Sequence, residues 1–255
     1  MNGLVLVYAA LAGLAIGSFL NVCVYRLPAG LSVVTPRSRC PRCERSIRWY
    51  ENIPVASYIA LRGRCRGCGG RISLQYPLVE LATGAIWVAM VARFGPTLAA
   101  LSGAVFLTLL LGIALTDARE YIIPDEFSVG GLLLGLAFAA LPGGMPFLCA
   151  AAGAAVGFGA LYLVAVAGQW LLRKEAMGGG DIKMMAMVGA FVGPWGALLT
   201  IFLGALLGTL IFGPITLFTK RLVPFGIFLA LGAAVTHGWG DELIRWYWGL
   251  LSGAG

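Results

Sequence analysis

Charged residues are scarce in this sequence. Asp, Glu, Lys and Arg make up only 11% of the 255 residues, whereas hydrophobic residues make up 60%, and the mean hydropathy is +0.90. A soluble protein of this length has no interior large enough to hide so much apolar surface. The scarcity therefore excludes a soluble globular protein and predicts an all-α, polytopic membrane protein. The 37 glycines agree with this prediction, because small residues let membrane helices pack closely.

The features of a cleaved signal peptide are also missing. The first apolar run is GLVLVYAALAGLAIGSFLNVCVY, and neither a basic region before it nor an A-x-A-like site after it is present. The run is long enough to span a bilayer. We therefore expect residues 1–23 to form a retained first transmembrane helix.

No internal repeat or low-complexity segment stands out, so the helices are placed from apolar runs alone. Long runs occur at about 3–22, 78–94, 97–116, 127–142, 147–172 and 196–219, and shorter ones at about 184–194 and 224–238. We expect about eight transmembrane helices. The polar insert at 24–76 is the only candidate for a small module outside the membrane, and residues 77–255 are expected to form a helical membrane bundle.

Basic residues are distributed unevenly over the predicted loops. With eight spans, sixteen of the eighteen Lys and Arg fall on the side of insert 24–76, and only Arg93 and Arg245 fall on the other. Because cytoplasmic loops are enriched in Lys and Arg, the insert is expected to be cytoplasmic and both termini extracytoplasmic. An arginine-rich loop also suits nucleic acid. These arginines flank cysteines beside a membrane, however, so we expect lipid headgroups of the bilayer as counter-charge and no nucleic-acid partner.

Four of the six cysteines form two C-x2-C pairs in the insert, CPRC at 40–43 and CRGC at 65–68. Two such turns can present four thiolates to one tetrahedral metal ion, and the alternative is a pair of redox-active dithiols. A reducing cytoplasm argues against two structural disulfides. We expect a structural Zn2+, because four cysteine ligands leave no open position for catalysis. The predicted ligands are Cys40, Cys43, Cys65 and Cys68, whereas Cys23 and Cys149 are expected to be small buried hydrophobes.

The eleven acidic residues are unevenly placed as well. Asp117, Glu120, Asp125 and Glu126 follow the third predicted helix, and Asp181 follows the fifth. The predicted topology puts Asp117 and Asp181 at the cytoplasmic end of the bundle, where ionisable residues are functional by default. Two carboxylates that lie close together cannot both ionise easily. One can hold a proton while the other activates water, which is the chemistry of aspartic proteolysis.

Three glycines, 178–180, precede Asp181. They loosen the helix end and remove side chains, so an extended substrate backbone could approach the carboxylate. Structural roles are also open, because Asp117 could pair with Arg119 and Asp181 could cap a helix. We interpret two further acidic residues as helix caps, Asp125 after Pro124 and Glu80 after Pro77.

The motifs together resemble the bacterial type IV prepilin peptidases, membrane aspartyl proteases of the G-x-G-D type. The matching blocks are GSFLNVCVYRLP at 17–28, CPRC, WYENIPVASYIALRGRCRGC at 49–68, ISLQYPLVE at 72–80, Asp117 with IIPDEFS, and GGGDIK at 178–183. They occur in the right order over nearly the whole chain. Ser128 stands where many relatives have threonine, a small departure with little bearing on the chemistry.

The resemblance implies two activities at the bacterial inner membrane. One cleaves the leader peptide of type IV prepilins or pseudopilins on the cytoplasmic side, and the other N-methylates the new N-terminal residue, usually phenylalanine, with S-adenosylmethionine. The family's catalytic aspartates match Asp117 and Asp181, in the bundle, and its tetra-cysteine loop matches the insert. Gly63 matches a family glycine linked with methyl transfer, although it could equally be an ordinary turn glycine. No soluble-type cofactor motif marks the site of the methyl donor.

Two other functional classes fit part of the pattern. A proton-coupled or metal transporter would account for membrane carboxylates and a zinc module, but transporters usually place their carboxylates near the bilayer midplane. A scaffold of a secretion machine would use the zinc module as a docking surface, but it leaves the GGGD run unexplained.

Overall fold

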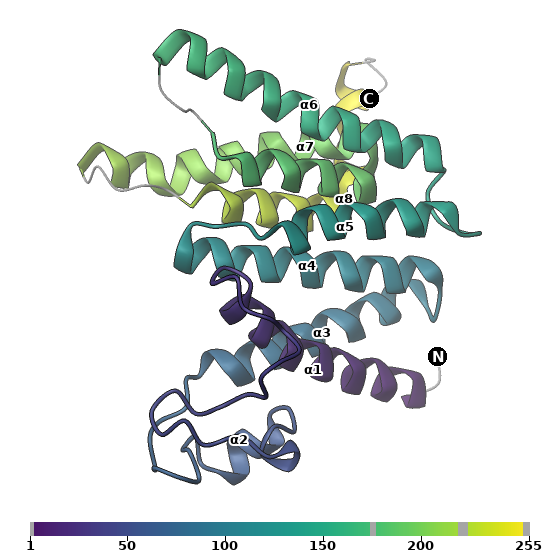
Figure 1. Ribbon diagram of the computed structural model, residues 1–255. Coiled ribbons are helices and arrows are strands. Elements are labelled where there is room, and N and C mark those ends of the chain that lie inside the picture. The colour runs from purple at the N-terminus through teal and green to yellow at the C-terminus, as the bar shows by residue number, and fades with distance from the viewer. Residues whose placement is uncertain (1–2, 174–176, 219–223, 252–255) are drawn as a thin grey trace. The chain divides into compact units, whose positions relative to one another are not determined.

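The computed structural model describes residues 3–173, 177–218 and 224–251 (Figure 1). The regular elements in these ranges are all helices, so the prediction of an all-α protein is confirmed. Backbone contacts divide the chain into two units, Met1–Thr108 and Leu109–Gly255, and the boundary falls inside α4 (Leu98–Glu120). This boundary does not test the functional division at residues 23 and 76, which stays a prediction.

The first unit is built on two helices in backbone contact. It contains α1 (Gly3–Arg26), the 3-10 helix η1 (Trp49–Glu51), α2 (Ala56–Ala60), α3 (Gln75–Phe94) and the start of α4. A Cβ on Gly13 would lie 2.8 Å from the Cα of Gly84, and one on Gly17 would lie 2.8 Å from the Cα of Glu80. These α1 glycines are four residues apart, the spacing that lets membrane helices approach closely. They therefore set the α1–α3 contact from which the insert extends.

The second unit is organised around α7. It contains the rest of α4, α5 (Asp125–Ala140), α6 (Phe147–Leu172), α7 (Gly179–Phe218) and α8 (Phe225–Leu251). Helix α7 packs against α5, α6 and α8. Gly153 on α6 and Gly189 on α7 face one another so closely that a Cβ on either would overlap the backbone of the other. Small residues thus bring α6 and α7 into backbone contact.

Helix α7 reverses direction at Gly193, which has φ 73° and ψ −179° (Figure 1). Gly180, near its start, packs against Ile123, whose side chain also reaches Gly226 at the start of α8. Gly208, in the part of α7 after the reversal, packs against Phe225 and Phe228 near the start of α8. Because residues on both sides of Gly193 lie near the start of α8, the two parts of α7 run back against one another.

The reversal agrees with the prediction of separate segments at 184–194 and 196–219. Glycine tolerates the positive φ that the turn requires, and the following Pro194 is favoured in the first turn of a helix. Among the residues that the structure describes, five helical stretches are long and apolar enough to cross a membrane, namely α1, α3, α4, α6 and Gly179–Ile211 of α7, and the last of these contains the reversal at Gly193. A multi-pass membrane protein is thereby supported, whereas the number of eight spans stays a prediction.

Candidate metal centre and carboxylate site

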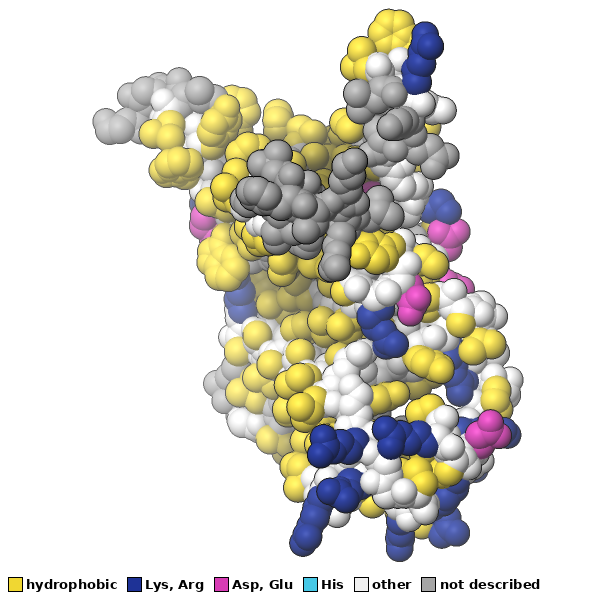
Figure 2. All heavy atoms as spheres, turned by 90° about the vertical axis from the view of Figure 1, so that its left-hand side faces the viewer, with side chains coloured by type: hydrophobic (Ala, Val, Ile, Leu, Met, Phe, Trp, Pro, Cys, Tyr) yellow, Lys and Arg dark blue, Asp and Glu magenta, His cyan; other side chains and the backbone are white. Residues whose placement is uncertain are grey.

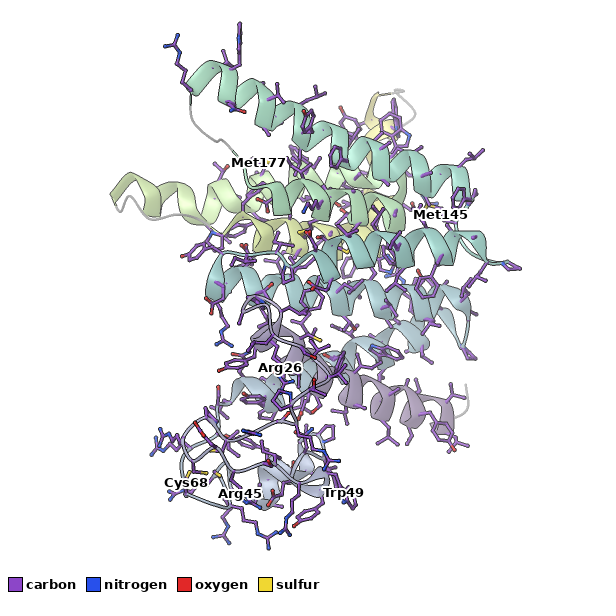
Figure 3. The ribbon with its side chains drawn as sticks, in the orientation of Figure 1. Arg26, Arg45, Trp49, Cys68, Met145 and Met177 are labelled. Carbon is purple, nitrogen blue, oxygen red and sulfur yellow. The ribbon has the colours of Figure 1, made fainter. Side chains whose placement is uncertain are left out.

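The four cysteines of the insert form one cluster. Their sulfur atoms all lie within 4.8 Å of one another. The Sγ atoms of Cys40 and Cys68 are 3.9 Å apart, and those of Cys43 and Cys65 are 4.0 Å apart. A tetrahedral zinc ion with Zn–S bonds of about 2.3 Å needs sulfurs about 3.8 Å apart. The cluster therefore fits a tetrahedral metal, and Figure 3 shows Cys68 at its place in the insert.

The two cysteine pairs lie on turns of the same geometry. Antiparallel bridges join Arg39 to Ser46 in the first turn and Arg64 to Arg71 in the second. In each turn the first cysteine donates its N–H to a carbonyl five residues later, at 3.0 Å for Cys40 and 2.8 Å for Cys65. Matching positive φ angles occur at Glu44, 55°, and Gly69, 69°. RCPRCERS and RCRGCGGR thus form a short structural repeat, which extends the two C-x2-C motifs seen in the sequence.

Backbone N–H groups favour the thiolate form of two cysteines. The N–H groups of Arg42 and Cys43 hold the pKa of Cys40 below its ordinary value. Those of Cys68 and Gly67 lower the pKa of Cys65 to about 6, and the Gly67 nitrogen lies 3.4 Å from its sulfur. The thiolate is the form that binds metal.

Glu51 ties the two cysteine turns together. Its side chain is only 4% exposed and lies 2.9 Å from Arg45 in the first turn and 3.9 Å from Arg66 in the second. It also accepts the N–H of Arg48 at 3.1 Å. The hydrogen bond from Arg45 is the main cause that holds the pKa of Glu51 below its ordinary value. The Glu51 carboxylate thus holds the two cysteine turns together without contacting the cysteine sulfurs itself.

Asp117 lies at the end of α4 and meets the first turn of α8. It is 6% exposed, and its Oδ2 accepts the backbone N–H of Ile227 at 3.1 Å. A Cβ on Gly226 would lie 2.8 Å from the same oxygen. The start of a helix presents unpaired N–H groups, which favour a negative charge. Asp117 forms no ion pair with Arg119 within the described residues, so that alternative is not supported.

Asp181 lies in the first turn of α7 and is partly buried. Asp117 acts on it electrostatically, so the second unit brings the two carboxylates of the sequence hypothesis to one place. The side chain of Ile123 lies beside them, against Gly180 and Gly226. The start of α7, the end of α4 and the start of α8 therefore meet at one carboxylate site.

The interpretation of Asp125 as a helix cap is wrong. Pro124 occupies the cap position of α5 without a side-chain hydrogen bond. The Asp125 carboxylate instead accepts the Lys183 ammonium, at 2.8 Å and 2.9 Å. This ion pair links the starts of α5 and α7.

Glu80 is not a helix cap either. Its carboxylate accepts the backbone N–H of Val55 at 2.7 Å, so it binds the insert and not the start of its own helix. Cys23 is buried and Cys149 is half-buried, which agrees with their predicted structural roles.

The predicted glycines differ in their surroundings. Gly178 precedes α7, and a Cβ there would lie 3.4 Å from Asp181, whereas a Cβ on Gly179 would meet nothing within 4 Å. A Cβ on Gly180 would lie 3.0 Å from Ile123. Gly63 has φ 65° and packs against the Tyr58 ring, so a turn requires glycine there in any case, and its link with methyl transfer stays a prediction.

Comparisons with known proteins give one family match in the N-terminal part of the chain and another in the C-terminal part. The family described as "Bacterial Peptidase A24 N-terminal domain" matches residues 11–94. The "Type IV leader peptidase family" matches residues 104–213, which contain Asp117 and Asp181. A relative from Aeromonas salmonicida is 35% identical over 268 residues, which cover 93% of this chain and 91% of the relative. The chain belongs to the type IV leader peptidase family.

Two further relatives show how far the similarity extends. A protein from Pseudomonas putida is 37% identical over 92% of this chain and 91% of its own length. One from Myxococcus xanthus is 45% identical over 80% of this chain but only 62% of its own length. All three relatives are named "Prepilin leader peptidase/N-methyltransferase". No solved structure gives a significant match.

Sequence reasoning missed the residues that support the two sites. Glu51 and Gly226 lie in no metal or carboxylate motif, and their contacts show their roles. A signal was present for Gly226, since it follows a proline at the start of an apolar run.

Proposed function

We propose that this chain cleaves the leader peptides of type IV prepilins or pseudopilins on the cytoplasmic side of the inner membrane and N-methylates the new N-terminal residue. The observation that carries the proposal is the carboxylate site of Asp117 and Asp181, in a family whose relatives bear these activities in their names. Ionisable groups that lie buried together in a membrane protein are typical of functional sites.

The hydrogen bonds suggest a different role for each aspartate. Asp117 accepts a backbone N–H, and such a bond favours the ionised form of a carboxylate. Asp181 accepts no hydrogen bond within the described residues, so the shared proton is assigned to it. Asp117 then takes a proton from water as the water attacks the scissile carbonyl. Asp181 gives its proton to the carbonyl oxygen. Asp117 passes the proton it took from water to the leaving nitrogen as the C–N bond breaks, and a hydroxyl of the intermediate returns a proton to Asp181.

Gly178 and Gly179 are proposed to let the substrate backbone reach the carboxylate site. Neither would meet protein atoms closer than 3.4 Å if it carried a Cβ, so both leave space beside Asp181. An extended substrate could use this space, because a helical peptide keeps its carbonyls in its own hydrogen bonds. Gly180 already packs against Ile123, so its first role is in packing.

The insert is proposed to be a cytoplasmic zinc module that serves methyl transfer. Sulfur atoms of different C-x2-C motifs lie as close as 3.9 Å and 4.0 Å, and all four lie within 4.8 Å of one another, which favours one metal over two separate dithiols. Cys40, Cys43, Cys65 and Cys68 would hold Zn2+, which supplies a structural crosslink. S-adenosylmethionine is the proposed methyl donor, and Gly63 is retained as a residue associated with its use.

The proposed topology places the insert in the cytoplasm and both termini outside. Eight of its ten arginines are exposed, and Figure 2 shows basic side chains gathered on this part of the molecule. Anionic lipid headgroups are their proposed partners. The substrate's own apolar helix would lie in the bilayer and leave its leader at the cytoplasmic interface.

One experiment tests the function as a whole. The purified protein is incubated with a membrane-embedded prepilin, with and without S-adenosylmethionine. We expect leader cleavage in both samples and N-methylation only with the donor. A transporter or a scaffold would give neither product.

A further inference from the structure

The first unit contains a buried carboxylate that leader cleavage does not use. Glu80 of α3 is 7% exposed. Within the described residues it accepts one hydrogen bond, from the Val55 N–H at 2.7 Å, and it forms no ion pair. A buried carboxylate has acceptor capacity for more donors than one. Glu80 is therefore a buried carboxylate with spare acceptor capacity and no cationic partner among the described residues.

A buried acceptor on α1 also lacks a partner. Asn21 is 4% exposed, and its Nδ2 donates to the carbonyls of Gly17 at 3.2 Å and Tyr76 at 3.1 Å. Its Oδ1 is buried and accepts no hydrogen bond. Exchange of the two amide atoms would turn the oxygen toward two carbonyls, so these contacts fix the orientation of the side chain.

Contacts between α1 and α3 bring these two groups to the same level. Asn21 bonds to Tyr76, while Gly17, one turn earlier on α1, packs against the Cα of Glu80, one turn later on α3. Helical side chains lean toward the N-terminus of their helix, so the Glu80 carboxylate leans toward the turn of Tyr76. The unpaired Asn21 oxygen and the Glu80 carboxylate thus border one place, where α1 and α3 meet the insert.

Val55 of the insert also borders this place, and its backbone is strained. Val55 has φ 60° and ψ −49°, a conformation that β-branched residues rarely adopt. Its N–H is the group that holds Glu80. Such strain persists where the surroundings enforce it, and it concentrates at binding and catalytic sites.

We propose that Glu80 and Asn21 bind a primary α-ammonium group, the new N-terminus of the cleaved substrate. An ammonium carries three N–H donors and a positive charge, which match a carboxylate and an amide oxygen that lack donors. The proposal rests on the proposed function, since it identifies the methyl acceptor site of that activity. It places this site in the same unit as the metal centre.

The same carboxylate can prepare the amine for methylation. Glu80 takes one proton from the ammonium, which leaves a neutral amine with a free electron pair. This pair forms the N–C bond to the methyl group of a sulfonium donor, and the C–S bond electrons stay on sulfur. The product is a methylated ammonium, and the proton remains on Glu80 until it passes to water.

Binding of a synthetic peptide tests the site without any turnover. Two peptides begin with phenylalanine, one with a free α-amine and one N-acetylated, and their dissociation constants are measured on the full-length protein. We expect the wild type to bind the free amine roughly tenfold or more tightly than the acetylated peptide. Glu80→Gln should remove this preference, and Glu80→Asp should restore part of it. Glu44→Gln, at an exposed glutamate of the insert, should leave it unchanged.

The possible outcomes distinguish amine binding by Glu80 from a purely structural role of Glu80 and from binding of the methyl donor. A wild type without amine preference, or a Glu80→Gln variant that keeps it, would overturn the proposal. So would a Glu80→Gln variant that loses metal content and leader cleavage together with peptide binding. The methyl donor carries an α-ammonium too, so weaker donor binding with unchanged peptide binding would also overturn it. An amine preference that depends on Glu80 supports the site even if the wild type fails to cleave a prepilin.

Discussion

At the scale of single residues, the carboxylate site depends on backbone as much as on acidic side chains. The N–H of Ile227 bonds to Asp117, and the absence of a side chain on Gly226 lets that carboxylate lie against the start of α8. Glycine is needed at position 226 for close approach and not for an unusual φ, because its φ is not among the positive ones. The aspartate is therefore positioned by two residues far from it in the sequence.

Gly226→Ala should slow leader cleavage. Its methyl carbon would lie 2.8 Å from the Asp117 oxygen, so the carboxylate or the helix must move. A displacement of this size near a reacting group should reduce kcat by roughly 10- to 100-fold. Gly249→Ala on the same helix is the control, because a Cβ there meets nothing within 4 Å. Equal kcat values for the two variants would show that Gly226 does not position Asp117.

Gly179→Val should reduce cleavage without loss of stability. The position has open space in the protein, so an effect on activity would come from the substrate. Gly180→Val should lower both cleavage and thermal stability, because its side chain would overlap Ile123. Kinetics and melting temperatures of the two variants check this difference. A wild-type cleavage rate in the Gly179→Val variant would show that Gly179 does not provide access for the substrate.

At the scale of elements, the first turns of α5, α7 and α8 and the end of α4 hold the carboxylate site. The Asp125–Lys183 ion pair joins the starts of α5 and α7, but both side chains are well exposed, at 61% and 44%. Exposed ion pairs contribute only about 0–1 kcal/mol. The packing of Ile123 on Gly180 and Gly226 is therefore expected to matter more than the ion pair.

Asp125→Asn should keep most of the cleavage activity. The substitution removes one exposed charge and leaves Asp117 and Asp181 in place. We expect a change in kcat/KM of less than about fivefold, since the ion pair contributes little. Lys183→Met should behave in the same way. Complete inactivation of a folded Asp125→Asn protein would give Asp125 a direct role in catalysis.

The cysteine turns should depend on one metal. Elemental analysis should find about one zinc per chain, and Cys40→Ser or Cys65→Ser should release it. Cys149→Ser, outside the cluster, is the matched control. Glu51→Gln should keep the metal but lose it faster to a chelator, because Arg45 and Arg66 lose their shared partner. Disulfides among the four cysteines in place of a metal would contradict the metal site.

At the scale of the whole molecule, the two proposed activities draw on different units. The metal centre and the Glu80 site lie in Met1–Thr108, whereas Asp117 and Asp181 belong to Leu109–Gly255. We therefore expect the cysteine variants to lose methylation before they lose cleavage.

Sequence reasoning succeeded where a local pattern determines the structure. The apolar run at 147–172 coincides with α6, and the C-x2-C spacing predicted a cluster that the sulfur distances support. It failed where contacts join distant segments. The bond from Ile227 to Asp117 spans 110 residues, and no periodicity in a glycine-rich apolar chain marks it. The position of Glu80 after Pro77 suggests a helix cap, whereas its hydrogen-bond partner, Val55, lies 25 residues away in the insert.

The central claim is that Asp117 and Asp181 together cleave the leader. The direct measurement is the cleavage rate of a membrane-embedded prepilin by purified Asp117→Asn and Asp181→Asn proteins, beside wild type. Asparagine keeps the shape of each side chain but cannot hold or transfer the proton. We predict that each substitution lowers the rate by roughly three orders of magnitude or more, while metal content stays at the wild-type level. A wild-type cleavage rate in either variant would contradict the account.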